Sequence, residues 1–237
     1  MNKKCLSGST LKWIALITMF IDHIGAVLIP ALYSKGIGNM YVDWPGIYQI
    51  CRWIGRFSFP LYCFLLVEGF VHTSNKNKYF YRMLLFAFIS EIPFDYAVYG
   101  EIWYLSKQNI FFELLLGFML MQVSDFLLKN IKNQVLQGLS VITLWFGGML
   151  AAQVFKADYG LLGILSIGIL YLFRSVRELQ LLGGALSFYW EFPAPLGMIP
   201  AYFYNGQRGR QSKYFFYLFY PLHLALFGLI RYLISGI

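Results

Sequence analysis

The run from Trp13 to Ile29 constrains this chain most, because it is hydrophobic and long enough to cross a bilayer, yet carries Asp22 and His23 near its middle. An ionisable side chain at the centre of a membrane costs several kcal/mol, so it marks a functional site by default. Later apolar runs contain further groups of this kind, namely Arg56, Glu68, Glu91 and His223. The sequence therefore predicts an integral membrane protein with a buried polar site.

The composition supports one bilayer-embedded domain over residues 1–237. The chain is 59% hydrophobic and 13% charged, whereas soluble domains are about half apolar and about a quarter charged. The net charge of +8 does not indicate nucleic-acid binding. The basic residues fall in short clusters between apolar runs, as the positive-inside rule would place them, and form no single patch.

Hydropathy predicts an all-α bundle of about nine transmembrane spans. Thirteen basic residues fall on one predicted side and four on the other, which places the N-terminus in the cytoplasm and the protein in the cytoplasmic (inner) membrane. The seventh and eighth spans are short and interrupted by prolines, so they either cross the membrane or form a re-entrant hairpin. The predicted spans are 11–33, 47–71, 83–99, 110–128, 135–154, 159–173, 179–192, 194–205 and 214–234.

Several ionisable residues are expected at similar depth. Counting about 1.5 Å per helical residue puts His23, Glu91 and His223 near the middle of their spans, where they are predicted to meet in one cavity. Asp22 and His23 are adjacent, so they point about 100° apart on a helix. One of them is expected to face the cavity while the other pairs with a different span. Arg56 is a candidate ion-pair partner for Asp22 or for Glu91.

These residue types suit acyl transfer. Histidine accepts a proton from an attacking amine or hydroxyl near neutral pH, and a carboxylate can orient it. Lys76, Lys78 and Arg82, at the predicted inner mouth, are suited to bind a phosphorylated cytosolic donor such as acetyl-CoA. A purely structural role is open for each charged residue. A metal site is not expected, because none of the three histidines lies four residues from another.

Short motifs along nearly the whole chain resemble those of the TraX family of membrane proteins. Their order and spacing carry the resemblance, since each motif is short. They include Asp22-His23-Ile24-Gly25, Gly55-Arg56-Phe57-Ser58, Val67-Glu68-Gly69-Phe70 with His72, Ser90-Glu91-Ile92-Pro93, Ala157-Asp158-Tyr159-Gly160, Asn205-Gly206 and Tyr220-Pro221-Leu222-His223.

The resemblance implies an inner-membrane acetyltransferase, distantly related to larger transmembrane acyltransferases. The family is named for a conjugal-transfer protein that acetylates the N-terminus of pilin. Acetyl-CoA is then the expected donor, with lipid around the protein and an unidentified amine or hydroxyl as acceptor. His23 is expected to be the catalytic base. The site expected from the motifs and the charges comprises His23, Asp22, Glu91 and His223 for catalysis, and Arg56, Glu68, His72, Lys76, Lys78 and Arg82 for donor binding.

Two other classes of protein stay open at this point. Buried histidines and carboxylates beside a broken helix pair also suit a proton-coupled transporter. Such a transporter need not bind CoA and would show vectorial flux. A membrane scaffold would tolerate loss of His23 in function assays but lose stability when Arg56 or Glu91 is changed.

Overall fold

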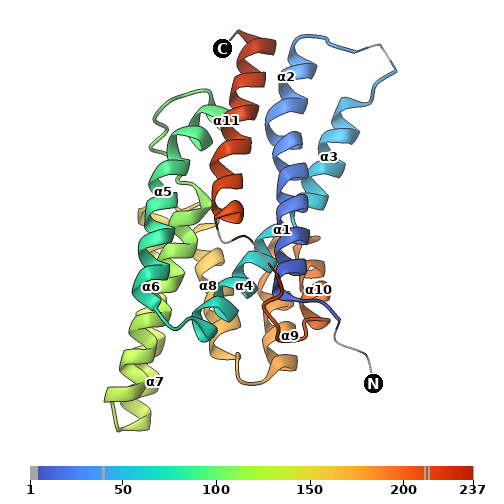
Figure 1. Cartoon of the computed structure of the whole chain (residues 1–237). Helices are drawn as coiled ribbons and strands as arrows, with labels where there is room; N and C mark the ends of the chain where they lie inside the picture. The colour runs from blue at the N-terminus through green and yellow to red at the C-terminus, as the bar shows by residue number, and fades with distance from the viewer. Residues whose placement is uncertain (1–4, 39–40, 211, 213, 237) are drawn as a thin grey trace.

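The computed structural model describes residues 5–38, 41–210, 212 and 214–236. These residues form helices and connecting turns, with no β-strand among them; the only β-type pairing described is a single bridge between Leu6 and Tyr204. The predicted all-α class is confirmed. The two ends of the chain lie at opposite ends of the molecule (Figure 1).

The first predicted span is one continuous helical segment in three parts: α1 (Gly8–His23), a π-helical turn (Ile24–Leu28) and α2 (Ile29–Ser34). Ser7 caps it, its hydroxyl accepting from the Thr10 N–H at 3.2 Å. The π turn ends two residues before Pro30, which lacks the N–H that a regular helix would donate to the carbonyl four residues earlier. Such turns are frequent at functional sites, and this one begins directly after His23.

The second predicted span, 47–71, is broken into α3 (Trp44–Gly55) and α4 (Ser58–His72), which run in different directions (Figure 1). The break falls where Pro60 cannot donate to the carbonyl of Arg56, so the helical ladder is interrupted there. Hydropathy alone does not detect such a break, because the residues on both sides are apolar.

The next four helices follow the prediction closely. They are α5 (Lys76–Tyr99), α6 (Ile110–Asn130), α7 (Gln134–Val154) and α8 (Gly160–Leu172). Helix α5 begins earlier than the predicted span, because the Asn75 side chain caps it by accepting from the Lys78 N–H at 2.8 Å. The hairpin of α6 and α7 extends beyond the other helices at one end of the molecule (Figure 1).

The predicted short pair, 179–192 and 194–205, does not form two spanning helices. It consists of α9 (Arg177–Ser187), two 3₁₀ turns (Tyr189–Glu191 and Ala194–Gly197) and α10 (Met198–Tyr202). Helices of 11 and 5 residues cover about 16 and 8 Å, less than the roughly 30 Å of a bilayer core. These lengths fit the re-entrant alternative. The last helix, α11 (Phe215–Ser235), packs most extensively against α5.

The buried apolar side chains form two clusters. The larger core is built mainly from α4, α6 and α8, and contains Phe64, Phe118 and Tyr171. The smaller core lies between α1, α5 and α11; its buried members are Met19, Val27, Phe94, Ala97, Tyr220, Leu224 and Phe227. Tyr62 and Ile110 pack against both clusters, so they mark the junction between the larger and the smaller core.

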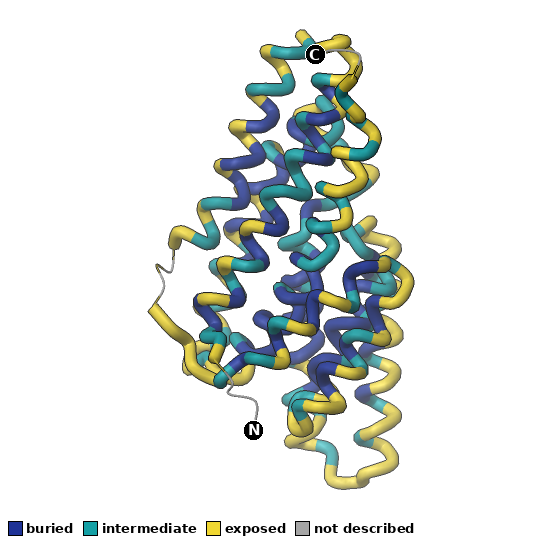
Figure 2. The backbone as a smooth tube through the Cα atoms, turned by 90° about the vertical axis from the view of Figure 1, so that its right-hand side faces the viewer, coloured by how far each residue is buried: buried dark blue, intermediate teal, exposed yellow. Residues whose placement is uncertain are grey.

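The outward faces of the helices are largely exposed (Figure 2), and many exposed residues on α7 are apolar, among them Leu139, Ile142 and Phe146. Such faces suit contact with lipid. Within the described residues, the helical segments long and apolar enough to cross a membrane are Gly8–Ser34, Trp44–His72, Ile110–Asn130, Gln134–Val154 and Phe215–Ser235. The membrane character is thus supported, whereas the count of about nine spans stays a prediction.

The connections alternate between two ends of the molecule. The N-terminal end of α1, the turn between α4 and α5 and the segment after α10 lie at one end, and the C-terminal end of α11 lies at the other (Figure 1). The distribution of basic residues predicts the same arrangement, with these three segments on one side of the membrane and the end of α11 on the other. Lys3, Lys4 and Lys213, which contributed to that expectation, lie outside the described residues, and the cytoplasmic placement of the N-terminus stays a prediction.

Candidate functional site

Two histidines from the first and last helices meet at the edge of the smaller core. His23 is the last residue of α1, and His223 lies in α11; the His23 Nδ1 is 2.8 Å from the His223 Nε2. The His223 Nδ1 is 2.7 Å from the carbonyl oxygen of Phe219. The predicted meeting of these two histidines is therefore present in the structure.

These two hydrogen bonds fix where the protons lie. A carbonyl oxygen only accepts, so the His223 Nδ1 carries a proton and donates it to Phe219. The Nε2 of a neutral His223 is then an acceptor, and the His23 Nδ1–H donates to it. The lone pair of neutral His23 consequently lies on its Nε2, which leaves that atom available as a base.

Aromatic rings enclose His223. The rings of Phe20, Phe219 and Phe227 have centroids 5.9, 4.9 and 5.6 Å from the His223 ring. His223 is only 4% exposed, whereas His23 is partly exposed. His223 is thus the shielded residue that fixes the tautomer of His23, and His23 is the more open residue that carries the free lone pair.

A cavity of about 630 Å³ opens between α1, α4, α5 and α11. Its mouth is lined by Lys12, Lys78, Arg82 and Arg208, together with His72. Its opposite end is lined by Met19, Tyr62, Ile110, Phe111 and Tyr220. The cavity therefore has one basic end and one mostly apolar, aromatic end.

The apolar end of the cavity borders the histidine pair. Lys12, Met19 and His23 share one face of α1, because their spacings of seven and four residues are close to whole helical turns. The Tyr220 ring is 5.9 Å from the His23 ring and 5.8 Å from the His223 ring. Neither histidine lines the cavity itself. Met19 and Tyr220 therefore lie between the cavity and the two histidines.

The mouth concentrates positive charge. Arg208 and Arg82 lie close enough for their charges to act on Lys12. Among the described residues, no carboxylate forms an ion pair with Lys78, Arg82 or Arg208. Arg82 lies beside the Tyr217 hydroxyl, while its buried Nε has no hydrogen-bond partner among the described residues. Glu68 also lines the cavity but is paired with Arg177, so basic side chains outnumber acids there, which suits an anionic ligand.

Backbone hydrogen bonds between the N-terminal segment and the chain after α10 build one wall of the mouth. The Gly8 N–H donates to the Gln207 carbonyl at 2.8 Å, and the Ser9 N–H donates to the Arg208 carbonyl at 2.9 Å. Gly209, at φ +71, packs directly on the Ser7 side chain, a backbone conformation and a close approach that favour glycine. These contacts hold Arg208 beside α1.

The predicted partners of Arg56 are not the ones observed. Its Nη1 lies 2.6 Å from the Glu191 Oε1, and Asp22 instead binds Arg52, with 2.7 Å between Oδ2 and Nη1. The expectation that Asp22 and His23 face different helices holds, because Asp22 turns to α3 and His23 to α11. Neither Asp22 nor Arg56 lines the cavity.

Glu91 does not reach the histidine pair. Its Oε2 accepts from the Asn109 N–H at 3.1 Å and also from the Asn109 side-chain amide. The same amide donates to the Ala87 carbonyl at 2.8 Å. Glu91 therefore fixes the segment that precedes α6, and the expectation that it joins His23 and His223 in one cavity is wrong.

The residues expected to bind the donor divide into two groups. Glu68, His72, Lys78 and Arg82 line the cavity, whereas Arg56 and Lys76 do not. The Glu68 Oε1 binds Arg177 at 3.0 Å, and its Oε2 is 3.5 Å from the His72 Nε2.

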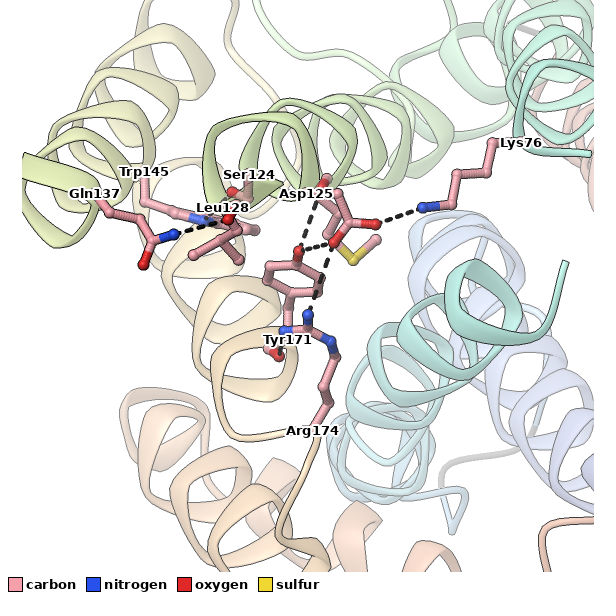
Figure 3. Close-up of polar contacts among 9 residues, drawn as sticks. Lys76, Ser124, Asp125, Leu128, Gln137, Trp145, Tyr171 and Arg174 are labelled. Atoms are coloured by element: carbon pink, nitrogen blue, oxygen red, sulfur yellow. Dashed lines mark hydrogen bonds and ion pairs between the residues drawn. The ribbon is translucent and has the colours of Figure 1, made fainter. Parts of the chain in front are cut away.

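Lys76 takes part in an ion-pair network beside the larger core (Figure 3). Its Nζ lies 2.6 Å from the Asp125 Oδ2, while the Tyr171 hydroxyl donates to the Asp125 Oδ1 at 2.6 Å. Arg174 adds a longer contact of 3.7 Å to the same carboxylate. Lys76 is thus paired with Asp125 and does not line the cavity, which favours a structural role.

Sequence reasoning missed several polar residues that the fold uses. Glu113 is fully buried, and its Oε2 accepts from the N–H groups of Tyr159 and Gly160 at 3.1 and 3.0 Å. Glu113 could have been found in the same way as Glu91, because it too is an acidic residue within a predicted apolar span, 110–128. Arg208 carried no signal, because it lies in a polar connection whose approach to α1 depends on tertiary structure. Within the described residues there is no group of three or more His, Cys, Asp or Glu side chains placed to hold a metal ion.

Comparison with known proteins agrees with the motifs in the sequence. The family described as "TraX protein" matches residues 7–231, from the start of α1 into the last turns of α11. The chain is also similar to a protein of Dichelobacter nodosus described as "Probable fimbrial assembly protein FimC, serogroup H1", with 29% identity over 243 residues that cover 93% of each chain. No solved structure matches. The family match covers almost the whole chain and includes both histidines. This chain therefore belongs to the TraX family.

Proposed function

We propose that this protein is an integral membrane acetyltransferase that moves an acetyl group from acetyl-CoA to an amine or hydroxyl acceptor. One observation carries the proposal: a cavity with a basic mouth ends beside a histidine pair whose proton arrangement leaves one nitrogen free as a base. Membership of the TraX family supports the same function. So does the expected position of the cavity mouth on the cytoplasmic side, where acetyl-CoA is present.

The dimensions of the cavity suit an acyl-CoA donor. Lys12 at the mouth and His23 are eleven residues apart on α1, which is about 16 Å along the helix. An extended arm that holds its phosphates at Lys78, Arg82 and Arg208 would bring its thioester towards Tyr220 and His23. Charge-assisted bonds from lysine and arginine to phosphate are among the strongest polar contacts in proteins.

The proposed reaction is direct transfer. The His23 Nε2 takes a proton from the acceptor, whose nitrogen or oxygen attacks the thioester carbonyl carbon. The new bond to carbon forms, the carbon–sulfur bond breaks, and the CoA thiolate leaves and receives the proton. The His223 ring stabilises the charged form of His23 through its Nε2. An amino group is the preferred acceptor, because the Dichelobacter relative carries the name of a fimbrial assembly protein and fimbrial subunits present such groups.

The deciding test is turnover by detergent-purified protein. Wild type is expected to bind acetyl-CoA saturably and to release CoA, with an acceptor peptide or by self-acetylation. His23→Gln is expected to keep the fold and the binding of CoA but to lose at least about a hundredfold in turnover, as loss of a general base does. Full turnover in His23→Gln would remove the assignment of His23.

A second measurement tests the mouth. Lys78→Ala with Arg82→Gln is expected to raise the KM for acetyl-CoA more than it lowers kcat, because it removes binding of the phosphates. Lys129→Ala is the matched control, since Lys129 is exposed and lies outside the cavity lining. If a well-folded wild type binds neither acetyl-CoA nor longer acyl-CoAs, the proposal fails and flux assays for proton-coupled transport become the next experiment.

A further inference from the structure

We propose that the hydroxyl of Tyr220 is the hydrogen-bond donor to the thioester oxygen during transfer, oriented by the N-terminus of α6. This inference rests on the proposed function and assigns a catalytic role to a residue that was not among the site residues expected from the sequence.

Tyr220 occupies the position where a reacting carbonyl would arrive. It lines the apolar end of the cavity, is only 4% exposed, and contacts the rings of both His23 and His223. Tyr62 and Ile110, at the junction of the two cores, line the same end. A donor at this place faces a poorly hydrated environment, in which a hydrogen bond to a developing negative charge is strengthened.

The free N–H at the start of α6 orients the Tyr220 hydroxyl. The Asn109 side-chain oxygen accepts from the Phe111 N–H at 2.9 Å, and its carbonyl accepts from the Phe112 N–H at 3.1 Å. The Ile110 N–H is left between them, and it lies near the hydroxyl oxygen of Tyr220. An oxygen that faces an N–H offers a lone pair to it, so the Tyr220 proton is directed to another acceptor, and the cavity supplies one when the thioester is bound.

The dipole of α6 strengthens this donor. The helix has 21 residues, and its N-terminal end carries partial positive charge. A phenol that accepts from this end becomes a better donor to an anionic oxygen through the shared hydrogen-bond chain. The arrangement stabilises the oxyanion that forms when the acceptor attacks, and it releases the oxygen when the carbonyl reforms and CoA leaves.

Glu91 holds the start of α6 in place. Through Asn109 it fixes the residue that directly precedes Ile110, and Asn109 is fully buried. Glu91 therefore acts as a positioning residue for Tyr220, which accounts for its place within α5 without direct contact to the histidines. Replacing it would shift the Ile110 N–H and so reduce transfer indirectly.

The test compares Tyr220→Phe with Tyr62→Phe and with Tyr232→Phe in the full-length protein. Tyr232 is the matched control, because it lies on the same helix and is 51% exposed outside the cavity lining. Tyr220→Phe is expected to lower kcat by about a hundredfold, the range for loss of one oxyanion donor. The KM for acetyl-CoA, CoA binding and thermal unfolding should stay at wild-type values.

Infrared spectroscopy of bound acetyl-CoA labelled with ¹³C at the carbonyl tests the contact directly. The carbonyl stretch should move to lower frequency on binding to wild type and to Tyr232→Phe, and should stay near its solution value in Tyr220→Phe. Full kcat in Tyr220→Phe beside an active wild type overturns the role of Tyr220 alone. Loss of kcat in Tyr62→Phe only would assign the donor to Tyr62 instead. No turnover by wild type overturns this inference together with the proposed function.

Discussion

Beside the larger core, the carboxylate of Asp125 is held by Lys76, Tyr171 and Arg174 (Figure 3). Beside the smaller core, His23 makes one described side-chain hydrogen bond, from its Nδ1 to the His223 Nε2, which leaves its own Nε2 free. Both regions place ionisable groups between apolar helices. They differ in how many partners each group has and in whether those groups border the cavity.

The difference separates structural from chemical use of polar residues in this fold. A group whose hydrogen-bonding capacity is filled by the protein holds helices together, and its loss should lower stability. A group that keeps one lone pair or proton free next to a cavity can act on a ligand, and its loss should lower turnover. Four substitutions test whether this division holds.

The largest expected effect is on His223, beside the smaller core. His223→Ala removes the acceptor that fixes the His23 tautomer, so turnover should fall by about a hundredfold, at the lower end of effects on general acid–base catalysis. His223→Gln places an amide near the former Nε2 and should restore part of the rate. Because His223 is buried and both of its ring nitrogens are hydrogen-bonded, His223→Ala should also lower the free energy of unfolding, so turnover is compared per folded molecule. Wild-type turnover in His223→Ala would show that His23 works without this partner.

Asp125→Ala tests the other side of the comparison. It leaves the Lys76 ammonium and the Tyr171 hydroxyl without their shared acceptor, and the free energy of unfolding should fall by about 2 kcal/mol, less than for a fully buried pair because the site is partly exposed. Unfolding in mixed detergent and dodecyl sulfate would measure this change. The turnover per folded molecule should match wild type; a specific loss of turnover would mean that this network belongs to the site.

Gly55→Ala probes the contact between α1 and α3 near His23. An added methyl group would overlap the carboxylate of Asp22, which packs directly on Gly55. Moving that carboxylate away from Arg52 should cost about 1–2 kcal/mol of stability, as overpacking does. A change in unfolding without a change in turnover would place Asp22 with the structural groups; loss of both would place it with the site.

The smallest effect is expected for Ser124→Ala in the larger core. The Trp145 indole N–H donates to the Ser124 hydroxyl at 3.0 Å, and both residues are buried. Losing this acceptor should lower the free energy of unfolding by about 1 kcal/mol. The measurement is the same unfolding assay, with Ser140→Ala at a half-buried position of α7 as the control. An equal effect in both variants would argue against a specific role for this hydrogen bond.

The sequence predicted most helices well where hydrophobicity and length agree. The predicted spans 110–128 and 135–154 differ from α6 and α7 by two residues or fewer at each end. The predicted span 47–71 lies within Trp44–His72, which is long and apolar enough to cross a membrane, but the prediction missed the break inside it, where proline and glycine interrupt an apolar run without changing its hydropathy. It left open the region 179–205, whose short helices depend on packing against α4 and α8.

The candidate site was predictable in part. Buried ionisable residues indicated His23 and His223, and their contact follows from similar depth. The partners of Arg56 and Glu91 were not predictable, because Glu191 and Asn109 lie in irregular segments whose depth hydropathy does not report. The role proposed for Tyr220 could not be inferred either, since aromatic residues are frequent in this chain and only the Ile110 N–H distinguishes this one.

The pairing of His23 with His223 has a consequence for the timing of synthesis. The two residues are 200 positions apart, and at about 5–20 residues per second a ribosome needs roughly 10–40 seconds to pass from one to the other. During that interval α1 is already made, but its histidine has no partner and the cavity has no α11 wall. If the proposed function holds, a nascent or truncated chain is therefore expected to be inert towards acceptors, with activity beginning only when the last helix is in place.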